Sequence, residues 1–145
     1  MPDALSLSIR NVPGDLALLE EPLDAYLRRE GACDSAAYAL RLALEELLTN
    51  RIKYGFRQGE EHRLDISLSR LEDGAFRLAI SDDGDDFNPC LSEEPDGMGQ
   101  PLHERGIGGL GLHMVRQMSS SMSHRRENGR NTLVVTVQNK EKEAK

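Results

Sequence analysis

Two short runs of alternating apolar and polar residues, joined by a glycine turn, constrain the fold of this 145-residue chain most strongly. Residues 64–68 and 76–80 each follow this period of two, and Glu72-Asp73-Gly74 lies between them. The period predicts two half-buried strands, and the turn predicts that they pair as an antiparallel hairpin. A sheet with one apolar face has to be covered on that face by a second layer of structure.

The other periodic segments supply this second layer. A helix is predicted from Asp15, acting as its N-cap, to about Arg29, and a longer helix from Asp34 or Ser35 to about Tyr54. The remaining predicted elements are strands at 5–9, 122–126 and 133–137 and a short helix at 108–118. The order β-α-α-β-β-loop-α-β-β predicts an α/β two-layer sandwich, with a mixed, mostly antiparallel sheet and helices on one face.

The charge of the chain is unevenly distributed along the sequence. The chain carries 25 acidic and 18 basic residues, which gives a net charge of −7. Seven of the acids and no base lie between Asp82 and Asp96, so the rest of the chain is neutral. Because there is no basic excess, nucleic acid is not expected as a direct partner.

Length and composition predict one soluble domain. No apolar run approaches the ~18 residues of a membrane span, the N-terminus lacks a signal-peptide pattern, and the two cysteines lie far apart. These features predict a cytoplasmic protein with free thiols and no membrane contact. We expect residues 1–138 to form the domain, 83–107 to form a long functional loop, and 139–145 to form a flexible charged tail.

A glycine cluster directly precedes the short predicted helix. Residues 106–111 match the pattern G-x-G-x-x-G, but no strand comes immediately before them and position 131 is Asn131 rather than an acid, which excludes a dinucleotide fold. No Lys-Ser or Lys-Thr follows, which excludes a P-loop. The small residues and the helix N-terminus still favour an anion-binding site. A flexible glycine hinge is the alternative.

Three polar residues share one face of the long predicted helix. Glu46, Asn50 and Lys53 are spaced by four and three residues, whereas the leucines of the helix face the other way. A carboxylate, an amide oxygen and an ammonium group suit a site for Mg²⁺ and phosphate, with the carboxylate available as a base. An ordinary solvated helix face is the alternative.

A third polar cluster follows the second strand of the predicted hairpin. Asp82 at the strand end can accept a hydrogen bond from an exocyclic amine, and Gly84 leaves room for a flat ring to approach the backbone. The spacing of the acids from Asp82 or Asp83 does not match an EF-hand. An adventitious cation at this cluster remains an open alternative.

Taken in order, these three clusters resemble a known family. Glu46-Leu-Leu-Thr-Asn50, Asp82-x-Gly84-x-x-Phe87-x-Pro89 and Arg105-Gly-Ile-Gly-Gly-Leu-Gly-Leu112 are similar to the N, G1 and G2 boxes of the GHKL (histidine kinase-like) ATPase superfamily. Within that superfamily the chain resembles the RsbW-type anti-sigma factor serine/threonine kinases. The resemblance implies a Bergerat-type ATP-binding fold in which 83–107 is the ATP lid.

The resemblance also implies roles for individual residues. Glu46 corresponds to the general base, Asn50 to the Mg²⁺ ligand and Asp82 to the residue that contacts the adenine amine, with Gly84 giving it room. Arg105 corresponds to the residue that contacts the terminal phosphate, and Lys53 and Thr132 are weaker matches on the phosphate and adenine sides. The glycines expected to hold the triphosphate are Gly106, Gly108, Gly109 and Gly111.

The implied activity is ATP- and Mg²⁺-dependent phosphorylation of a STAS-domain anti-anti-sigma protein, with a sigma factor as the second partner and a homodimer as the usual assembly. Two alternatives remain: a nucleotide-gated binding module that sequesters a partner without phosphotransfer, and a detached histidine-kinase catalytic domain.

Arg51 departs from the family pattern. It lies three, four and seven residues after Leu48, Leu47 and Leu44, so it falls on the apolar face of the long helix. Either its guanidinium group snorkels out at the helix end, which we favour, or it pairs with an acid.

Overall fold

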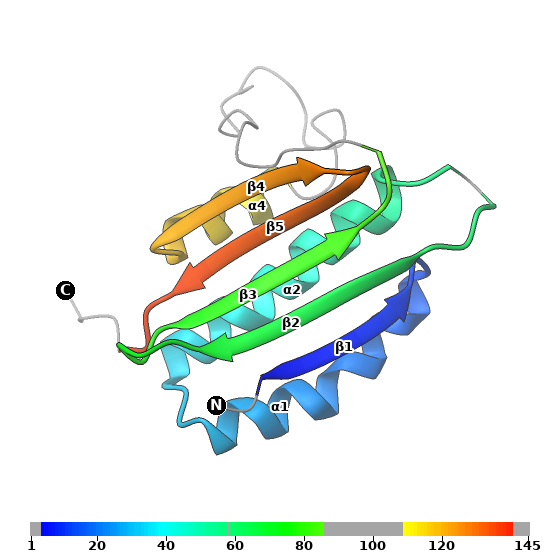
Figure 1. Cartoon of the computed structure of the whole chain (residues 1–145). Coiled ribbons are helices and arrows are strands. Elements are labelled where there is room, and N and C mark those ends of the chain that lie inside the picture. The colour runs from blue at the N-terminus through cyan, green and yellow to red at the C-terminus, as the bar shows by residue number, and fades with distance from the viewer. Residues whose placement is uncertain (1–3, 58, 86–108, 141–145) are drawn as a thin grey trace.

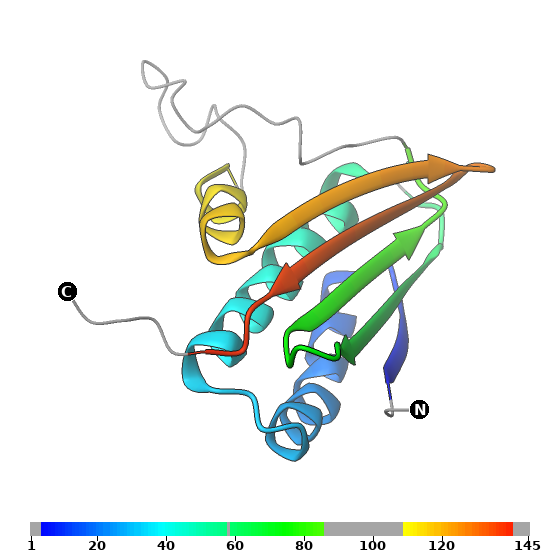
Figure 2. The same cartoon turned by 60° about the vertical axis from the view of Figure 1, so that its left-hand side comes forward.

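The computed structural model of the chain describes residues 4–57, 59–85 and 109–140. Within these ranges five strands form one sheet in the order β1-β2-β3-β5-β4. All four neighbouring strand pairs are antiparallel. The helices cover one face of the sheet and leave the other open (Figure 1, Figure 2). The predicted two-layer α/β sandwich is confirmed, with a described sheet that is antiparallel throughout.

The elements follow the predicted order. Their bounds are β1 (Leu5–Arg10), the 3₁₀ helix η1 (Pro13–Leu19), α1 (Glu20–Arg29), α2 (Asp34–Tyr54), β2 (Arg63–Arg70), β3 (Phe76–Asp82), α4 (Gly109–Met118), β4 (Ser121–Glu127) and β5 (Arg130–Val137).

Both hairpins turn where the sequence predicts. Gly74, between β2 and β3, has a φ of 91°, a conformation that glycine adopts without strain. Asn128 and Gly129, between β4 and β5, have φ values of 52° and 77°, as a tight Asn-Gly hairpin turn requires. The second turn sets the register of β4 against β5, in which Arg126 lies opposite Asn131. On its other side β5 pairs with β3, and Asn131 lies opposite Asp82.

The long helix α2 holds the two layers together. It contacts β3, β5, η1 and α4. Leu40, Leu44, Leu47 and Leu48 on its inner face are buried in the core, together with the inward-facing residues of the strands. Its last turn carries Arg51 and Lys53, which favourably oppose the partial negative charge of the helix C-terminus.

The first predicted helix is divided in two. Residues 13–19 form η1, and the α-helical part begins only at Glu20. Pro22 explains the division, because a proline there excludes an α-helix that continues from the preceding turn. Asp15 is not an N-cap: its carboxylate accepts hydrogen bonds from the backbone N–H and the guanidinium group of Arg10 (3.0 and 2.9 Å).

Within the described ranges, no helix combines the length and the apolar character needed to cross a membrane.

Candidate functional site

Glu46, Asn50 and Lys53 lie along one side of α2, and their burial differs. Asn50 is buried, Glu46 is half-buried and Lys53 is exposed. Burial raises the pKa of Glu46 above its usual range, and the neighbouring charge of Glu45 raises it further, while Lys53 acts in the opposite direction. A carboxylate with a raised pKa is a better proton acceptor, which suits a general base.

The carboxylate of Glu46 lies against the first turn of α4. A β-carbon added to Gly111 would overlap Glu46 Oε1, so the two helices approach this closely only because residue 111 has no side chain. The helix α4 begins at Gly109 and packs against α2. Its positive N-terminus therefore lies beside the candidate base. Asn50 is one helical turn further along α2.

Asn50 fits the expected metal ligand. Its side-chain oxygen Oδ1 is buried and has no hydrogen-bond partner among the described atoms. An amide oxygen without a donor is the hard ligand that Mg²⁺ prefers, and Mg²⁺ normally completes its octahedron with water and phosphate oxygens. The described residues contain no cluster of three or more His, Cys, Asp or Glu residues that could bind a metal ion without such help.

Asp82 ends β3 with its side chain in the interior. It is 1% exposed, and its Oδ1 atom accepts hydrogen bonds from the backbone N–H of Gly84 (2.8 Å) and from Asn131 Nδ2 (3.3 Å). Burial by itself raises the pKa of Asp82, but the hydrogen bonds and the charge of Arg51 outweigh it. The pKa is held below its usual range, so this residue is a carboxylate at neutral pH.

Arg51 does not snorkel out at the helix end: it forms a buried ion pair with Asp82. Nε donates to Asp82 Oδ2 at 2.9 Å and Nη2 donates to Asp82 Oδ1 at 2.7 Å, the two parallel bonds of a bidentate pair. The two side chains are only 6% and 2% exposed. The guanidinium group stays inside because its partner carboxylate is there, and solvation at the surface offers a weaker alternative to a bidentate contact.

Gly84 makes room for this arginine. A β-carbon on Gly84 would lie 2.8 Å from Arg51 Nη2 and 2.8 Å from the ring of Phe56, and it would overlap the carbonyl oxygen of Gly55. A β-carbon on Gly55 would meet Arg51 Cζ at 2.7 Å. In this structure the space over Gly84, expected to admit a flat ring, is filled by side chains of the protein itself.

The other predicted site residues divide into two groups. Thr132 is next to Asn131 on β5, and because side chains alternate along a strand it faces the open side of the sheet, away from Asp82. Arg105, Gly106 and Gly108 lie outside the described residues, as does most of the predicted lid.

Two residues of this cluster were not singled out from the sequence. Asn131 donates to Asp82 and to the carbonyl oxygens of Gly84 and Asp85 (3.1 Å each). Arg126 Nη1 donates to Gly84 O and to Asn131 Oδ1, both at 3.0 Å. The register of the β4–β5 hairpin, fixed by its Asn-Gly turn, places Arg126 opposite Asn131 and could have linked these two residues. The pairing of β5 with β3, which places Asn131 opposite Asp82, has no such local signal.

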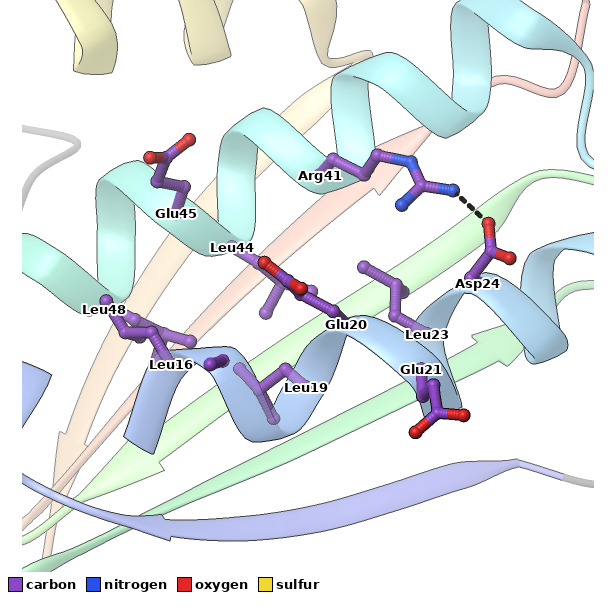
Figure 3. Close-up of a pocket in the computed structure, with 11 residues that line it drawn as sticks. Leu16, Leu19, Glu20, Glu21, Leu23, Asp24, Arg41, Leu44, Glu45 and Leu48 are labelled. Atoms are coloured by element: carbon purple, nitrogen blue, oxygen red, sulfur yellow. Dashed lines mark hydrogen bonds and ion pairs between the residues drawn. The ribbon is translucent and has the colours of Figure 1, made fainter. Parts of the chain in front are cut away.

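A separate cleft of about 560 Å³ lies between α2 and the η1–α1 segment (Figure 3). Leucines from both sides line it, and Glu20, Glu21 and Glu45 lie at its edges, with Arg41 bound to Asp24 at 2.7 Å. None of the predicted site residues lines this cleft.

The fold and the placement of the motifs define a class of protein. The model of the histidine kinase-like ATPase domain matches residues 9–137, and the chain belongs to this family. Within the family, similar proteins include a serine-protein kinase RsbW from Listeria monocytogenes, 26% identical over 121 residues that cover 81% of this chain and 76% of that protein. The serine/threonine-protein kinase BtrW of Bordetella bronchiseptica is 27% identical over 99 residues, 68% of each chain.

Solved structures support the fold. A chain of the crystal structure of the RsbU and RsbW domains of Rv1364c from Mycobacterium tuberculosis aligns with a TM-score of 0.66 at 16% identity, covering 94% of this chain and 32% of that one. The SiaB–SiaC complex from Pseudomonas aeruginosa aligns with a TM-score of 0.55 at 20% identity, covering 90% and 88%.

Proposed function

We propose that this protein is an ATP- and Mg²⁺-dependent serine/threonine protein kinase that acts as an anti-sigma, partner-switching regulator. Its substrate is a serine or threonine of a STAS-domain anti-anti-sigma protein, and its second partner is a sigma factor. One observation carries the kinase assignment: the half-buried Glu46 carboxylate lies against Gly111 at the N-terminal turn of α4. A protein that only binds its partner has no need of a base at this position. The relatives named as serine kinases support the same assignment.

The residues then have these roles. Glu46 accepts the proton of the substrate hydroxyl group as the hydroxyl oxygen bonds to the γ-phosphorus of ATP. The bond between that phosphorus and the oxygen that bridges it to the β-phosphate breaks, and ADP leaves. Asn50 would hold Mg²⁺ through its side-chain oxygen together with phosphate oxygens of ATP, and the ion would supply positive charge against those oxygens. Gly106, Gly108, Gly109 and Gly111 place backbone N–H groups around the triphosphate, and Arg105 stabilises the charge of the transferred group. Lys53 lies on the phosphate side.

The organisation of the chain belongs to the same proposal. Residues 1–138 form one ATPase domain in which 83–107 are the lid over the nucleotide, and the active form is a homodimer. We do not assign Thr132 a contact with adenine beside Asp82, because the two side chains lie on opposite faces of the sheet.

The proposal is tested with radiolabelled ATP and a candidate STAS-domain protein. We expect phosphoserine or phosphothreonine on that protein, and E46Q should lower the rate at least 100-fold while nucleotide binding is kept, since general-base catalysis contributes about 10²–10⁴-fold. The matched control is E21Q, which makes the same substitution at an exposed carboxylate on α1. A wild-type rate for E46Q would refute the base assignment. Acid-labile phosphohistidine would indicate a histidine kinase instead.

One observation favours a second candidate, a binding module without phosphotransfer. Arg51 occupies the carboxylate of Asp82, on which adenine recognition depends. If partner binding is strong and no phosphate is transferred at any ATP concentration, this second function replaces the first.

A further inference from the structure

The hydrogen-bonding capacity of Asp82 is already used within the protein. A carboxylate has about four lone-pair sites. Oδ1 accepts from Arg51 Nη2, Gly84 N and Asn131 Nδ2, and Oδ2 accepts from Arg51 Nε. At 1% exposure, water does not compete for the carboxylate. A ligand amine that approaches Asp82 therefore has to displace a donor of the protein.

Arg51 is the strongest of these donors and is itself well enclosed. Its Nη2 also donates to the carbonyl oxygen of Asp85 at 2.8 Å, and its guanidinium carbon lies 5.7 Å from the centre of the Phe56 ring. Gly55 and Gly84 flank the group and provide its space. Two hydrogen bonds from a charged guanidinium group in a fixed fork are stronger than the single hydrogen bond that a neutral exocyclic amine donates to the same carboxylate.

One donor of Arg51 is left without a partner. Nη1 is buried and makes no hydrogen bond to the described atoms. Among the described atoms, Asp82 Oδ1 has three donors and Oδ2 has one, whereas Arg51 Nη1 has no acceptor. The carboxylate that the family resemblance assigns to the adenine amine is thus engaged by a cation of the protein.

We propose that Arg51 competes with the nucleobase for Asp82, and that this residue sets both the affinity and the base preference of the nucleotide site. The inference rests on the proposed function in one respect, namely that a nucleotide binds between α2, the end of β3 and α4. Adenine gains its contact with Asp82 only when Arg51 gives up one or both of its bonds. The consequence is weak binding of adenine nucleotides by the wild-type chain.

The test is isothermal titration calorimetry of the full chain with Mg·ADP and Mg·IDP. These nucleotides share their phosphates and ribose, but inosine carries a carbonyl oxygen where adenosine carries the exocyclic amine. We expect R51L to bind ADP at least tenfold more tightly than wild type, because the carboxylate becomes free for the amine. Binding of IDP should change by less than twofold.

Two further variants make the result independent of folding problems. R51Q keeps a polar side chain, but its neutral amide donates one hydrogen bond to Asp82 in place of the two from the charged guanidinium group. Its ADP affinity should therefore fall between those of wild type and R51L. R41L is the matched control, since Arg41 lies on the same helix and binds an aspartate, Asp24, at the surface. Its affinity for both nucleotides should equal that of wild type. If circular dichroism shows that R51L is unfolded, R51Q decides.

Three results would overturn the inference. ADP affinities of R51L and R51Q at or below that of wild type would exclude competition and leave the proposed kinase function intact. Equal gains for ADP and IDP would exclude an effect through the amine. Absence of binding in every variant would refute the nucleotide site itself, and with it both proposals.

Discussion

Arg51 and Asp82 are the two residues whose roles the structure changes most. Arg51 follows three leucines on the inner face of α2, and its pattern left open whether it reaches solvent or an acid. The pair joins the last turn of α2 to the end of β3, 31 residues further along the chain. Helical periodicity shows which way a side chain points, but it carries no information about which distant strand end meets it.

We predict that the single substitution D82A strongly destabilises the fold. The substitution leaves the guanidinium group of Arg51 buried without a counter-charge, which costs about 3–5 kcal/mol. Urea unfolding measures the loss, and D24A is the control, because Asp24 pairs with Arg28 and Arg41 at the surface and should cost at most about 1 kcal/mol. A loss below about 1 kcal/mol for D82A would contradict the buried pair.

The stabilisation from Asp82 also depends on pH. The pKa of Asp82 is lower in the folded chain than in the unfolded chain, so its ionised form stabilises the fold. This stabilisation is fully present at neutral pH, above the unfolded-state pKa, and is lost as acid protonates the carboxylate in the folded chain. The difference in unfolding free energy between wild type and D82A should therefore shrink at low pH.

The environment of Glu46 predicts the pH dependence of phosphotransfer. Burial and Glu45 raise its pKa, and the base acts only when deprotonated, so the rate should rise with pH over a range above that of an ordinary glutamate. E45Q removes a charge that raises the pKa of Glu46 and should move the rise in rate to lower pH. K53M removes a charge that lowers this pKa and should move the rise in rate to higher pH. Single-turnover rates from pH 4 to 8 measure both shifts, and identical profiles for the three proteins would contradict the assignment.

At the scale of elements, the contact of α4 with α2 brings two sequence motifs together. The sequence predicts that Gly111 helps to bind the triphosphate. In the structure, the absence of a side chain at residue 111 leaves the space that the carboxylate of Glu46 occupies. The predicted spans of α2 and of the β2–β3 hairpin agree with the structure to within two residues, whereas β5 begins at Arg130, three residues before the predicted start of the last strand. The first helix differs because Pro22 interrupts it.

We predict that G111A disturbs this contact. In an ordinary helix, alanine in place of glycine stabilises by roughly 0.5–1 kcal/mol, but here the new methyl group overlaps the end of the Glu46 side chain and displaces its carboxylate. The displacement should lower the rate of phosphotransfer. G14A is the control, because a β-carbon on Gly14 meets no atom within 4 Å. Equal phosphotransfer rates for the two variants would show that Glu46 does not lie against Gly111 as described.

At the scale of the whole molecule, the seven acids between Asp82 and Asp96 do not share one role. Asp82 is buried in an ion pair, and Asp83 Oδ1 lies 2.8 Å from His62 Nδ1 at the surface. The hydrogen bonds of His62 to Glu60 and Asp83 raise the pKa of its ring above the usual range. The excess negative charge available to a partner is thus carried by the remaining acids, most of which lie outside the described residues.

We expect partner binding to depend on these remaining acids. Exposed charges are screened by salt, so the affinity for a partner protein should fall as salt rises from 50 to 300 mM. E93Q/E94Q should flatten this dependence, while E20Q/E21Q, the same substitution on α1, should not. Affinities from calorimetry at each salt concentration give the two slopes, and a salt-independent wild type would refute a partner-facing role for the stretch.

Local patterns in the sequence are sufficient to predict the layers, the hairpins and the grouping of Glu46 with Asn50, because periodicity and turn chemistry are properties of neighbouring residues. They also predict Asp82 at a strand end. The pairing of Arg51 with Asp82, the presence of Asn131 and Arg126 in this cluster, and the contact of Glu46 with Gly111 are seen in the folded chain alone. These contacts depend on strand register and helix packing, which bring together residues that no local pattern links.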